Sequence, residues 1–189
     1  IMSYKKEVIK MNIWHDIDKK RINPDEFIAC IEISKGSKKK YELDKETGFL
    51  ILDRVLYTST HYPANYGFIP RTFADDNDPL DVLVLCQEII DPMALVRCYP
   101  IGVIKMIDSD DVDEKIIAIA ENDPSMNTYE NITDLPEHLF HEISHFFTVY
   151  KQLEGKDTYV RETLGKEEAI EIIKASIDRY EEIYGSKKK

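Results

Sequence analysis

The chain has 189 residues, of which 43% are hydrophobic and 32% are charged, and its formal net charge is −11. This balance is typical of a folded globular protein and excludes a disordered chain, while the acidic charge argues against a nucleic-acid partner. Apolar runs fall well short of the roughly 20 residues that span a bilayer, so we expect no membrane partner.

The length predicts one domain over residues 1–189, with 1–12 as an N-terminal extension and 186–189 as a solvated basic tail. The first residues lack the continuous apolar core of a secretory signal, which predicts a cytoplasmic location. The cysteines show no CxxC spacing and lie in apolar contexts, so buried free thiols are expected at Cys30, Cys86 and Cys98.

Short strands separated by turn signals are predicted in the first half of the chain, which favours a largely antiparallel β core. Phe27 to Ile33 is the first strand, and its two-residue period places Glu32 on an otherwise apolar face. Lys40 to Leu43 and Phe49 to Leu56 follow as a hairpin around residues 44–48. On its second arm an arginine shares one face with leucines, at Leu50, Leu52, Arg54 and Leu56.

An acidic loop precedes the next strand. Residues 61–70 form a rigid aromatic loop, and Asp76-Asn77-Asp78-Pro79-Leu80-Asp81 then places three carboxylates directly before the apolar run 82–85, a buried strand by its pattern. Carboxylates this close repel one another unless a hard cation such as Mg²⁺ binds them through oxygen. The loop therefore predicts a divalent metal site.

A second acidic element lies in a predicted hairpin that runs from Pro100 to Ile107, turns over residues 108–114 and returns from Lys115 to Ala120. The turn carries Asp108 and Asp113, and Asp113 faces the same way as Lys115. Two acidic elements, each beside a strand, are what several clustered divalent cations require.

The second half of the chain shows helical periodicity. Pro136 to Leu153 and Lys166 to Tyr184 are the two predicted helices, with Pro136 suited to a first turn and Gly185 to a stop. The elements together predict an α+β fold, a β barrel or curled sheet with helices packed outside.

Cations on one side of a site imply an anionic substrate on the other. Arginine and lysine bind phosphate by charge, and tyrosine donates a hydrogen bond from the end of a rigid side chain. The candidates of these types are Lys40, Arg54, Lys115, Lys151, Tyr62, Tyr66 and Tyr150.

From about Phe27 to Leu153 the sequence resembles the soluble family I inorganic pyrophosphatases. The most specific element is residues 76–84, DNDPLDVLV, which is similar to the family signature D-x-D-P-x-D-V-L-V. Further similar elements follow in the family's order: Lys40-Tyr41-Glu42, Asp53-Arg54, residues 62–67, Asp108-x4-Asp113-x-Lys115, and His145-Phe146-Phe147 before Tyr150-Lys151.

The resemblance implies a role for each matching residue. Asp78 would be the general base. The implied Mg²⁺ ligands are Asp76, Asp81 and Asp113 for one ion, Asp81 shared with a second, Asp108 with Asp113 for ions arriving with substrate, and Glu32 through water. The implied phosphate ligands are Lys40, Arg54, Tyr66, Lys115, Tyr150 and Lys151.

The resemblance also implies an OB-like five-stranded antiparallel barrel with flanking helices, and a homo-oligomer, a hexamer in many bacterial members. The implied reaction is hydrolysis of pyrophosphate to two phosphates by a Mg-activated water, in line and without a covalent intermediate. Mn²⁺ has similar oxygen preferences and is an alternative metal. Bacterial members often carry Glu after the first hairpin aspartate, where this chain has Ser109.

Other readings compete with this one. His141-Glu142-Ile143-Ser144-His145 is an H-E-x-x-H motif, which on a helix can mark a zinc peptidase. Its two histidines fall opposite the apolar stripe of the predicted helix, facing solvent rather than a cleft. A calcium loop fails on ligand spacing from Asp76, and an aspartyl-phosphate phosphatase would place its acidic pair after a strand. A non-enzymatic OB-type binding module leaves the acidic loop unexplained.

Overall fold

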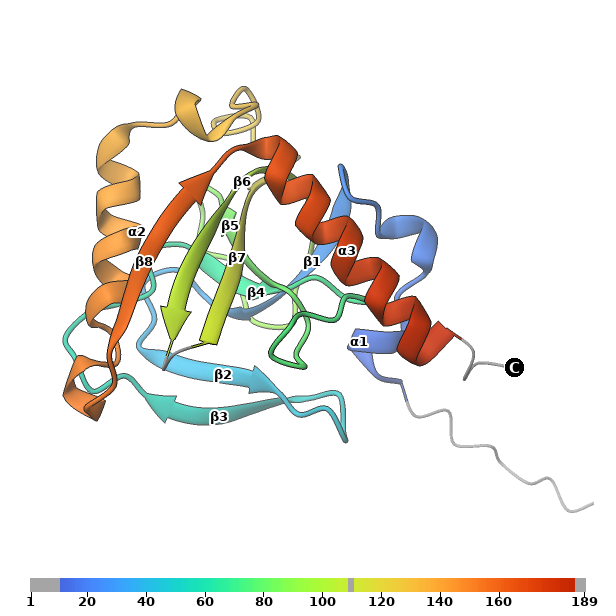
Figure 1. Ribbon diagram of the computed structural model, residues 1–189, viewed down its shortest axis with the longest axis horizontal. Helices are drawn as coiled ribbons and strands as arrows, with labels where there is room; N and C mark the ends of the chain where they lie inside the picture. Colours follow the sequence, from blue (N-terminus) through green and yellow to red (C-terminus); the bar gives the residue numbers. More distant parts are fainter. Residues whose placement is uncertain (1–10, 109–110, 186–189) are drawn as a thin grey trace, which may run out of the picture.

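The structure, a computed structural model, describes residues 11–108 and 111–185. Its strands are β1 (Phe27–Ile33), β2 (Lys39–Leu43), β3 (Leu50–Val55), β4 (Asn65–Phe68), β5 (Asp81–Leu85), β6 (Leu95–Asp108), β7 (Asp111–Ala120) and β8 (Thr158–Leu164). Its α-helices are α1 (Ile13–Asp16), α2 (Glu137–Val149) and α3 (Lys166–Tyr184). The arrangement confirms the α+β class (Figure 1).

Six strands form one mixed sheet in the order β1-β4-β5-β7-β6-β8, and an additional β1–β6 pairing closes a ring of five strands. Within the ring, β5 and β7 run parallel, with Asp81 opposite Lys115. The other ring pairings are antiparallel. The prediction of an antiparallel barrel is wrong for the β5–β7 pair. Alternation along a strand does not reveal the direction of its neighbour, although a continuous apolar run such as Val82–Leu85 suits a parallel strand buried on both faces.

The β2–β3 hairpin forms a two-stranded sheet of its own, which lies below the ends of β6 and β7 in Figure 1. The predicted hairpin is confirmed within one residue at each end. The predicted leucine face is buried only at its end, because Leu56 is 2% exposed whereas Leu52 is 49% exposed. The hairpin contacts the ring where β2 meets β1, whereas the middle of β3 is exposed.

Three further elements differ from the sequence prediction. The predicted acidic turn 108–114 is mostly strand, because β7 begins at Asp111 and pairs Asp113 with Met106. Ser109 lies outside the described residues. A short strand, β4, lies inside the loop predicted for 61–70, and β8 was not predicted. Both strands are short or largely exposed, so their sequences carry little periodicity.

The helices pack outside the ring, α2 beside β8 and α3 against β6 (Figure 1). The bounds of α3 are those predicted, whereas α2 ends at Val149. Of the described helices, none combines the length and apolar character that a bilayer span requires. The cysteines are free thiols, as predicted. Cys30 and Cys98 are buried, but Cys86 is partly exposed.

Gly67 in β4 is expected to tolerate no side chain. A Cβ built there would lie 1.9 Å from the carbonyl oxygen of Cys30, because β1 and β4 pair at this point. Gly67→Ala should therefore lower the free energy of unfolding by about 3 kcal/mol, measured by urea denaturation. Gly165→Ala is the matched control, since its Cβ would meet nothing closer than 3.6 Å. Equal stability of the two variants would contradict this account.

Candidate active site

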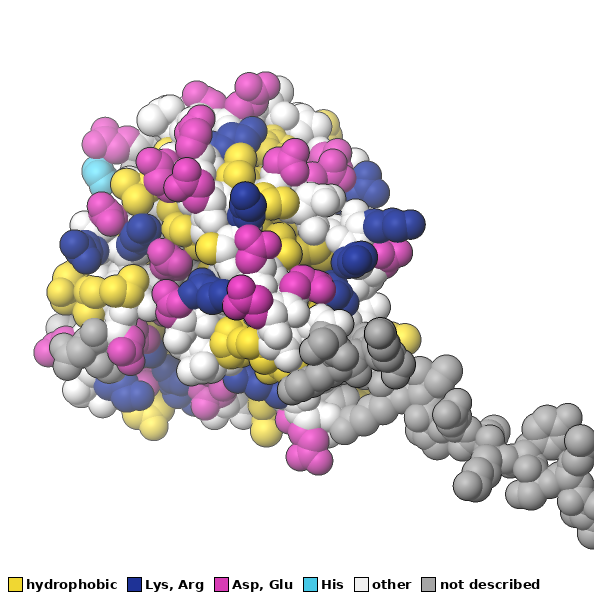
Figure 2. Space-filling model, turned by 45° about the vertical axis from the view of Figure 1, so that its right-hand side comes forward, with side chains coloured by type: hydrophobic (Ala, Val, Ile, Leu, Met, Phe, Trp, Pro, Cys, Tyr) yellow, Lys and Arg dark blue, Asp and Glu magenta, His cyan; other side chains and the backbone are white. Residues whose placement is uncertain are grey.

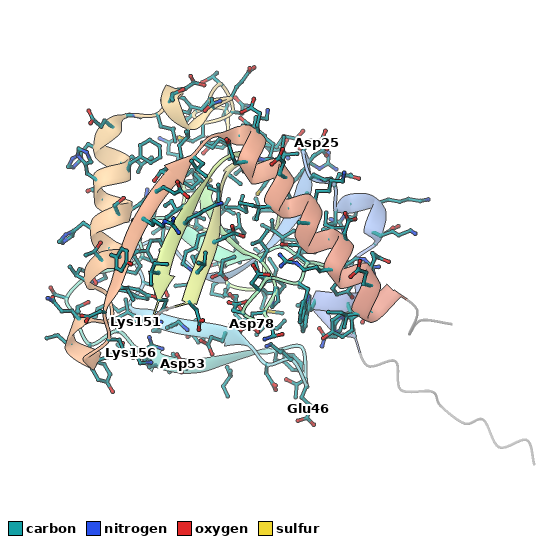
Figure 3. The ribbon with its side chains drawn as sticks, in the orientation of Figure 1. Asp25, Glu46, Asp53, Asp78, Lys151 and Lys156 are labelled. Atoms are coloured by element: carbon teal, nitrogen blue, oxygen red, sulfur yellow. The ribbon has the colours of Figure 1, made fainter. Side chains whose placement is uncertain are left out.

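One cavity of about 290 Å³ opens between the β2–β3 hairpin, the acidic loop before β5, the end of β6, the start of β7 and the end of α2. Figure 3 shows two of its residues, Asp78 and Lys151, at the level of the hairpin and below the ends of β6 and β7. Most of the predicted site residues line it, namely Glu32, Lys40, Tyr66, Asp76, Asp78, Asp81, Asp108, Asp113, Lys115, Tyr150 and Lys151.

Lys115 lies at the centre of this constellation and is 2% exposed. Its Nζ is 2.7 Å from Oδ2 of Asp81, 2.9 Å from Oδ2 of Asp113 and 3.1 Å from the Tyr66 hydroxyl. Tyr66 in turn donates its hydroxyl hydrogen bond to Asp81. The parallel β5–β7 register produces this contact, because it places Asp81 directly across from Lys115. One ammonium therefore joins the acidic loop to the acidic hairpin.

The electrostatics of this centre favour the charged lysine. Burial alone would lower the pKa of Lys115, but Asp113 and Asp81 hold it well above its usual value. Burial raises the pKa of Tyr66, and Asp81 adds to the rise, so the phenol keeps its proton. Burial also raises the pKa of Asp76. The backbone N–H of Asp78, which donates to Asp76 Oδ1 at 3.0 Å, lowers it in part. The site thus offers donors to an anion and carboxylates to a cation.

Two other lysines among the predicted phosphate ligands also line the cavity. Lys151, just beyond α2, forms an ion pair with Asp108, whose carboxylate also lies 3.5 Å from the Tyr150 hydroxyl. Lys40 on β2 pairs with Glu42 and lies 3.4 Å from Asp53. Each lysine is therefore held beside a carboxylate at the rim of the same cavity.

Two predicted phosphate ligands do not line the cavity. Arg54 pairs with Lys40 across the hairpin and contacts Asp53 and Glu154, the latter at 2.9 Å from Nε. Its Nη2 is buried without a hydrogen-bond partner among the described residues. Tyr62 is 2% exposed and packs its ring against Tyr66 and Phe146.

Glu32 is buried where the alternation of β1 predicts it, on an otherwise apolar strand. Its Oε1 accepts a hydrogen bond of 2.8 Å from the backbone N–H of Leu43, at the end of β2. Burial raises the pKa of Glu32 to about 8, and the Asp81 carboxylate contributes to the rise.

The donor set fits a hard divalent cation in kind, because several carboxylates face a single cavity. Among the described residues, however, no three His, Cys, Asp or Glu side chains are gathered closely enough to ligate an ion. The Lys115 ammonium lies between two of the expected ligands, Asp81 and Asp113. The carboxylates thus line a common cavity, and lysines offset part of their negative charge.

Some residues that line the cavity were not predicted from the sequence. Tyr41 and Glu42 belong to the Lys40-Tyr41-Glu42 element of the resemblance without an implied role, and both line the cavity. Lys45 also lines it and forms an ion pair with Asp78. Its sequence position, in a polar turn of five residues, carries no signal that separates it from a surface lysine.

The histidines of the H-E-x-x-H motif lie on α2, away from the cavity. His141 and His145 are both exposed, and Nε2 of His141 is 3.6 Å from Oε1 of Glu137 one turn earlier.

On the face shown in Figure 2, acidic and basic side chains are interspersed.

A model of the inorganic pyrophosphatase family matches residues 29–181. Soluble inorganic pyrophosphatase 2 of Chlamydomonas reinhardtii is 47% identical over 176 residues, which cover 93% of this chain and 91% of that protein. The chain belongs to the soluble family I inorganic pyrophosphatases. This membership makes it a hydrolase and leaves the peptidase reading without support.

Other pyrophosphatases agree with this assignment. Soluble inorganic pyrophosphatase 1 of Arabidopsis thaliana is 44% identical over 182 residues, covering 96% of this chain and 86% of that protein. The crystal structure of inorganic pyrophosphatase from Thermus thermophilus matches with a TM-score of 0.86 at 36% identity, covering 90% of this chain and 99% of that one. The structure from Helicobacter pylori has a TM-score of 0.82 at 42% identity, with 85% and 96% covered.

Replacing Glu32 by Gln is expected to flatten the pH dependence of stability. The unfolded chain releases the Glu32 proton near pH 4.5, whereas the folded chain keeps it to about pH 8. The stability contributed by this proton is therefore fully present below pH 4.5 and is lost as pH rises to 8. In urea unfolding with EDTA, the free energy of unfolding of the wild type should fall by about 1 kcal/mol per pH unit between pH 4.5 and 8, relative to that of Glu32→Gln. Parallel profiles would contradict the burial of this carboxyl group.

Proposed function

We propose that the chain hydrolyses inorganic pyrophosphate to two phosphates by direct in-line attack of water, without a covalent intermediate. The observation that carries this proposal is the convergence of the acidic loop, the acidic hairpin and four lysines on one cavity. Pyrophosphate is a small, highly charged anion, so its hydrolysis needs positioned positive charge more than an enzyme nucleophile.

Asp76, Asp81 and Asp113 would hold one Mg²⁺, Asp81 would share a second, and Asp108 would help Asp113 with ions that arrive with substrate. Glu32 would contribute through a water. When bound, Mg²⁺ neutralises phosphate charge and lowers the pKa of a coordinated water. Mn²⁺ would substitute, because it accepts the same oxygen ligands. The presence of these carboxylates in the lining of one cavity supports the assignment.

The substrate would be oriented by lysines and tyrosines at the cavity wall. Lys115, fixed between two carboxylates, and Lys151, beside Asp108, present ammonium groups from two sides. Tyr66 and Tyr150 present phenols, and burial raises the pKa of both. Lys40 completes the wall from β2. Arg54 and Tyr62, which do not line the cavity, stay predictions as phosphate ligands.

Asp78 would act as the general base. It lies at the tip of the acidic loop, three residues before Asp81, and its side chain lines the cavity. In the proposed step a water proton moves to Asp78 as the water oxygen attacks one phosphorus. The bridging P–O bond breaks in line, and the departing phosphate takes its electron pair.

We also propose that residues 1–189 form one domain, built on an OB-like barrel. The match over residues 29–181 and the closed ring of strands support this proposal. A homo-oligomer, a hexamer by family resemblance, is supported by exposed apolar side chains on β3 such as Ile51 and Val55. The predicted cytoplasmic location is supported by the names of the relatives, which call them soluble. The predicted tail 186–189 and most of the predicted extension 1–12 lie outside the described residues.

The direct test is phosphate release from pyrophosphate with and without Mg²⁺, beside ATP, a phosphomonoester and a peptide. We expect Mg²⁺-dependent release from pyrophosphate, with much slower release from the other phosphates and no peptide cleavage. Turnover of the peptide alone would overturn the proposal.

Asp78→Asn should lower kcat by at least about 100-fold, because the amide cannot accept the water proton. The variant should keep the wild-type Tm, since the Asp78 side chain is half exposed. It should also keep Mg²⁺ binding, measured by calorimetry. A variant with near-wild-type turnover at neutral pH would remove Asp78 from the role of base.

A further inference from the structure

Lys45 links the turn of the β2–β3 hairpin to the tip of the acidic loop. Its ammonium forms an ion pair with Oδ1 of Asp78 and donates to the backbone oxygen of Asn77 at 3.3 Å. Asn77 has a left-handed backbone, with φ of 68°, so the loop reverses direction at this residue. Lys45 thus contacts the loop at this left-handed residue and at Asp78, and it lines the same cavity as Asp78.

The position of Lys45 is set by the segment around α1. The side-chain amide of Asn12 donates to the Lys45 carbonyl at 2.9 Å, and the Lys45 ammonium lies 5.8 Å from the Trp14 ring centroid. Trp14 is 2% exposed, and its indole N–H donates to the Thr72 carbonyl at 2.9 Å. The same segment therefore contacts both the hairpin turn and the chain that leads into the acidic loop.

Several other carboxylates at or beside the cavity are also paired with cations. Lys115 joins Asp81 to Asp113, Lys151 holds Asp108, and Arg179 on α3 pairs with Asp75 beside the loop. Carboxylates this close repel one another, so a paired cation helps to hold their orientation. A base differs from its metal-binding neighbours in one respect, because it must keep an oxygen directed at the attacking water rather than at an ion.

We propose that Lys45 is a positioning residue of the reaction, which holds Asp78 through Oδ1 so that Oδ2 receives the water proton. The inference rests on the proposed function, since it assigns the base its orientation. The effect of Lys45 passes through Asp78 and should therefore appear in kcat rather than in substrate affinity.

The test compares Lys45→Met and Lys45→Arg with wild type, in kcat and KM for pyrophosphate at saturating Mg²⁺. Lys45→Met should lower kcat about tenfold, as expected for a misaligned base, with KM changed less than about threefold. Lys45→Arg should restore most of kcat, because it keeps the charge. The Tm of both should stay within about 2 °C of wild type, since the ion pair is half exposed.

A double-mutant cycle decides whether the effect passes through Asp78. In the Asp78→Asn background, Lys45→Met should change kcat less than about twofold, because the base is already removed. Lys174→Met, an exposed lysine of α3, is the matched control and should leave kcat unchanged. Wild-type kcat in Lys45→Met would overturn the inference, and so would a tenfold loss that persists without Asp78. Absence of Mg²⁺-dependent activity in wild type would instead overturn the proposed function.

Discussion

The site depends on one buried ammonium that joins two acidic elements. Lys115 is 2% exposed and lies within hydrogen-bond distance of both Asp81 and Asp113. Its place follows from the parallel pairing of β5 with β7, which sets Asp81 opposite Lys115. Removing one member of a buried ion pair leaves an uncompensated charge, which costs about 3 to 5 kcal/mol. The strand pairing of the ring therefore also fixes the position of the buried positive charge in the cavity.

The pairing of lysines with carboxylates explains how an acidic chain can accept an anion. Lysines from β2, from β7 and from beyond α2 line a cavity whose carboxylates would otherwise repel both one another and a phosphate. Each lysine has a carboxylate partner, so its ammonium is held in place before any anion arrives. Donors fixed in advance need no reorganisation during reaction, which is the main source of electrostatic catalysis.

Local signals predicted much of this structure. The two-residue period of Phe27–Ile33 placed Glu32 among apolar side chains, and the continuous apolar run after Asp81 marked β5, because buried strands are built from apolar residues. The parallel β5–β7 pairing could not be predicted, since it depends on contacts between residues about 34 positions apart. The resemblance named most of the residues that line the cavity. The sequence did not predict Lys45, because its contact with Asp78 arises from the fold and its turn looks like any polar turn.

The most direct test is an anomalous difference map from crystals grown with Mn²⁺. The account predicts a peak between Asp76, Asp81 and Asp113, with the Lys115 ammonium moved away from at least one of its two carboxylates. A peak elsewhere on the surface, with Lys115 still joining Asp81 to Asp113, would contradict a metal centre at the junction of the acidic loop and the acidic hairpin.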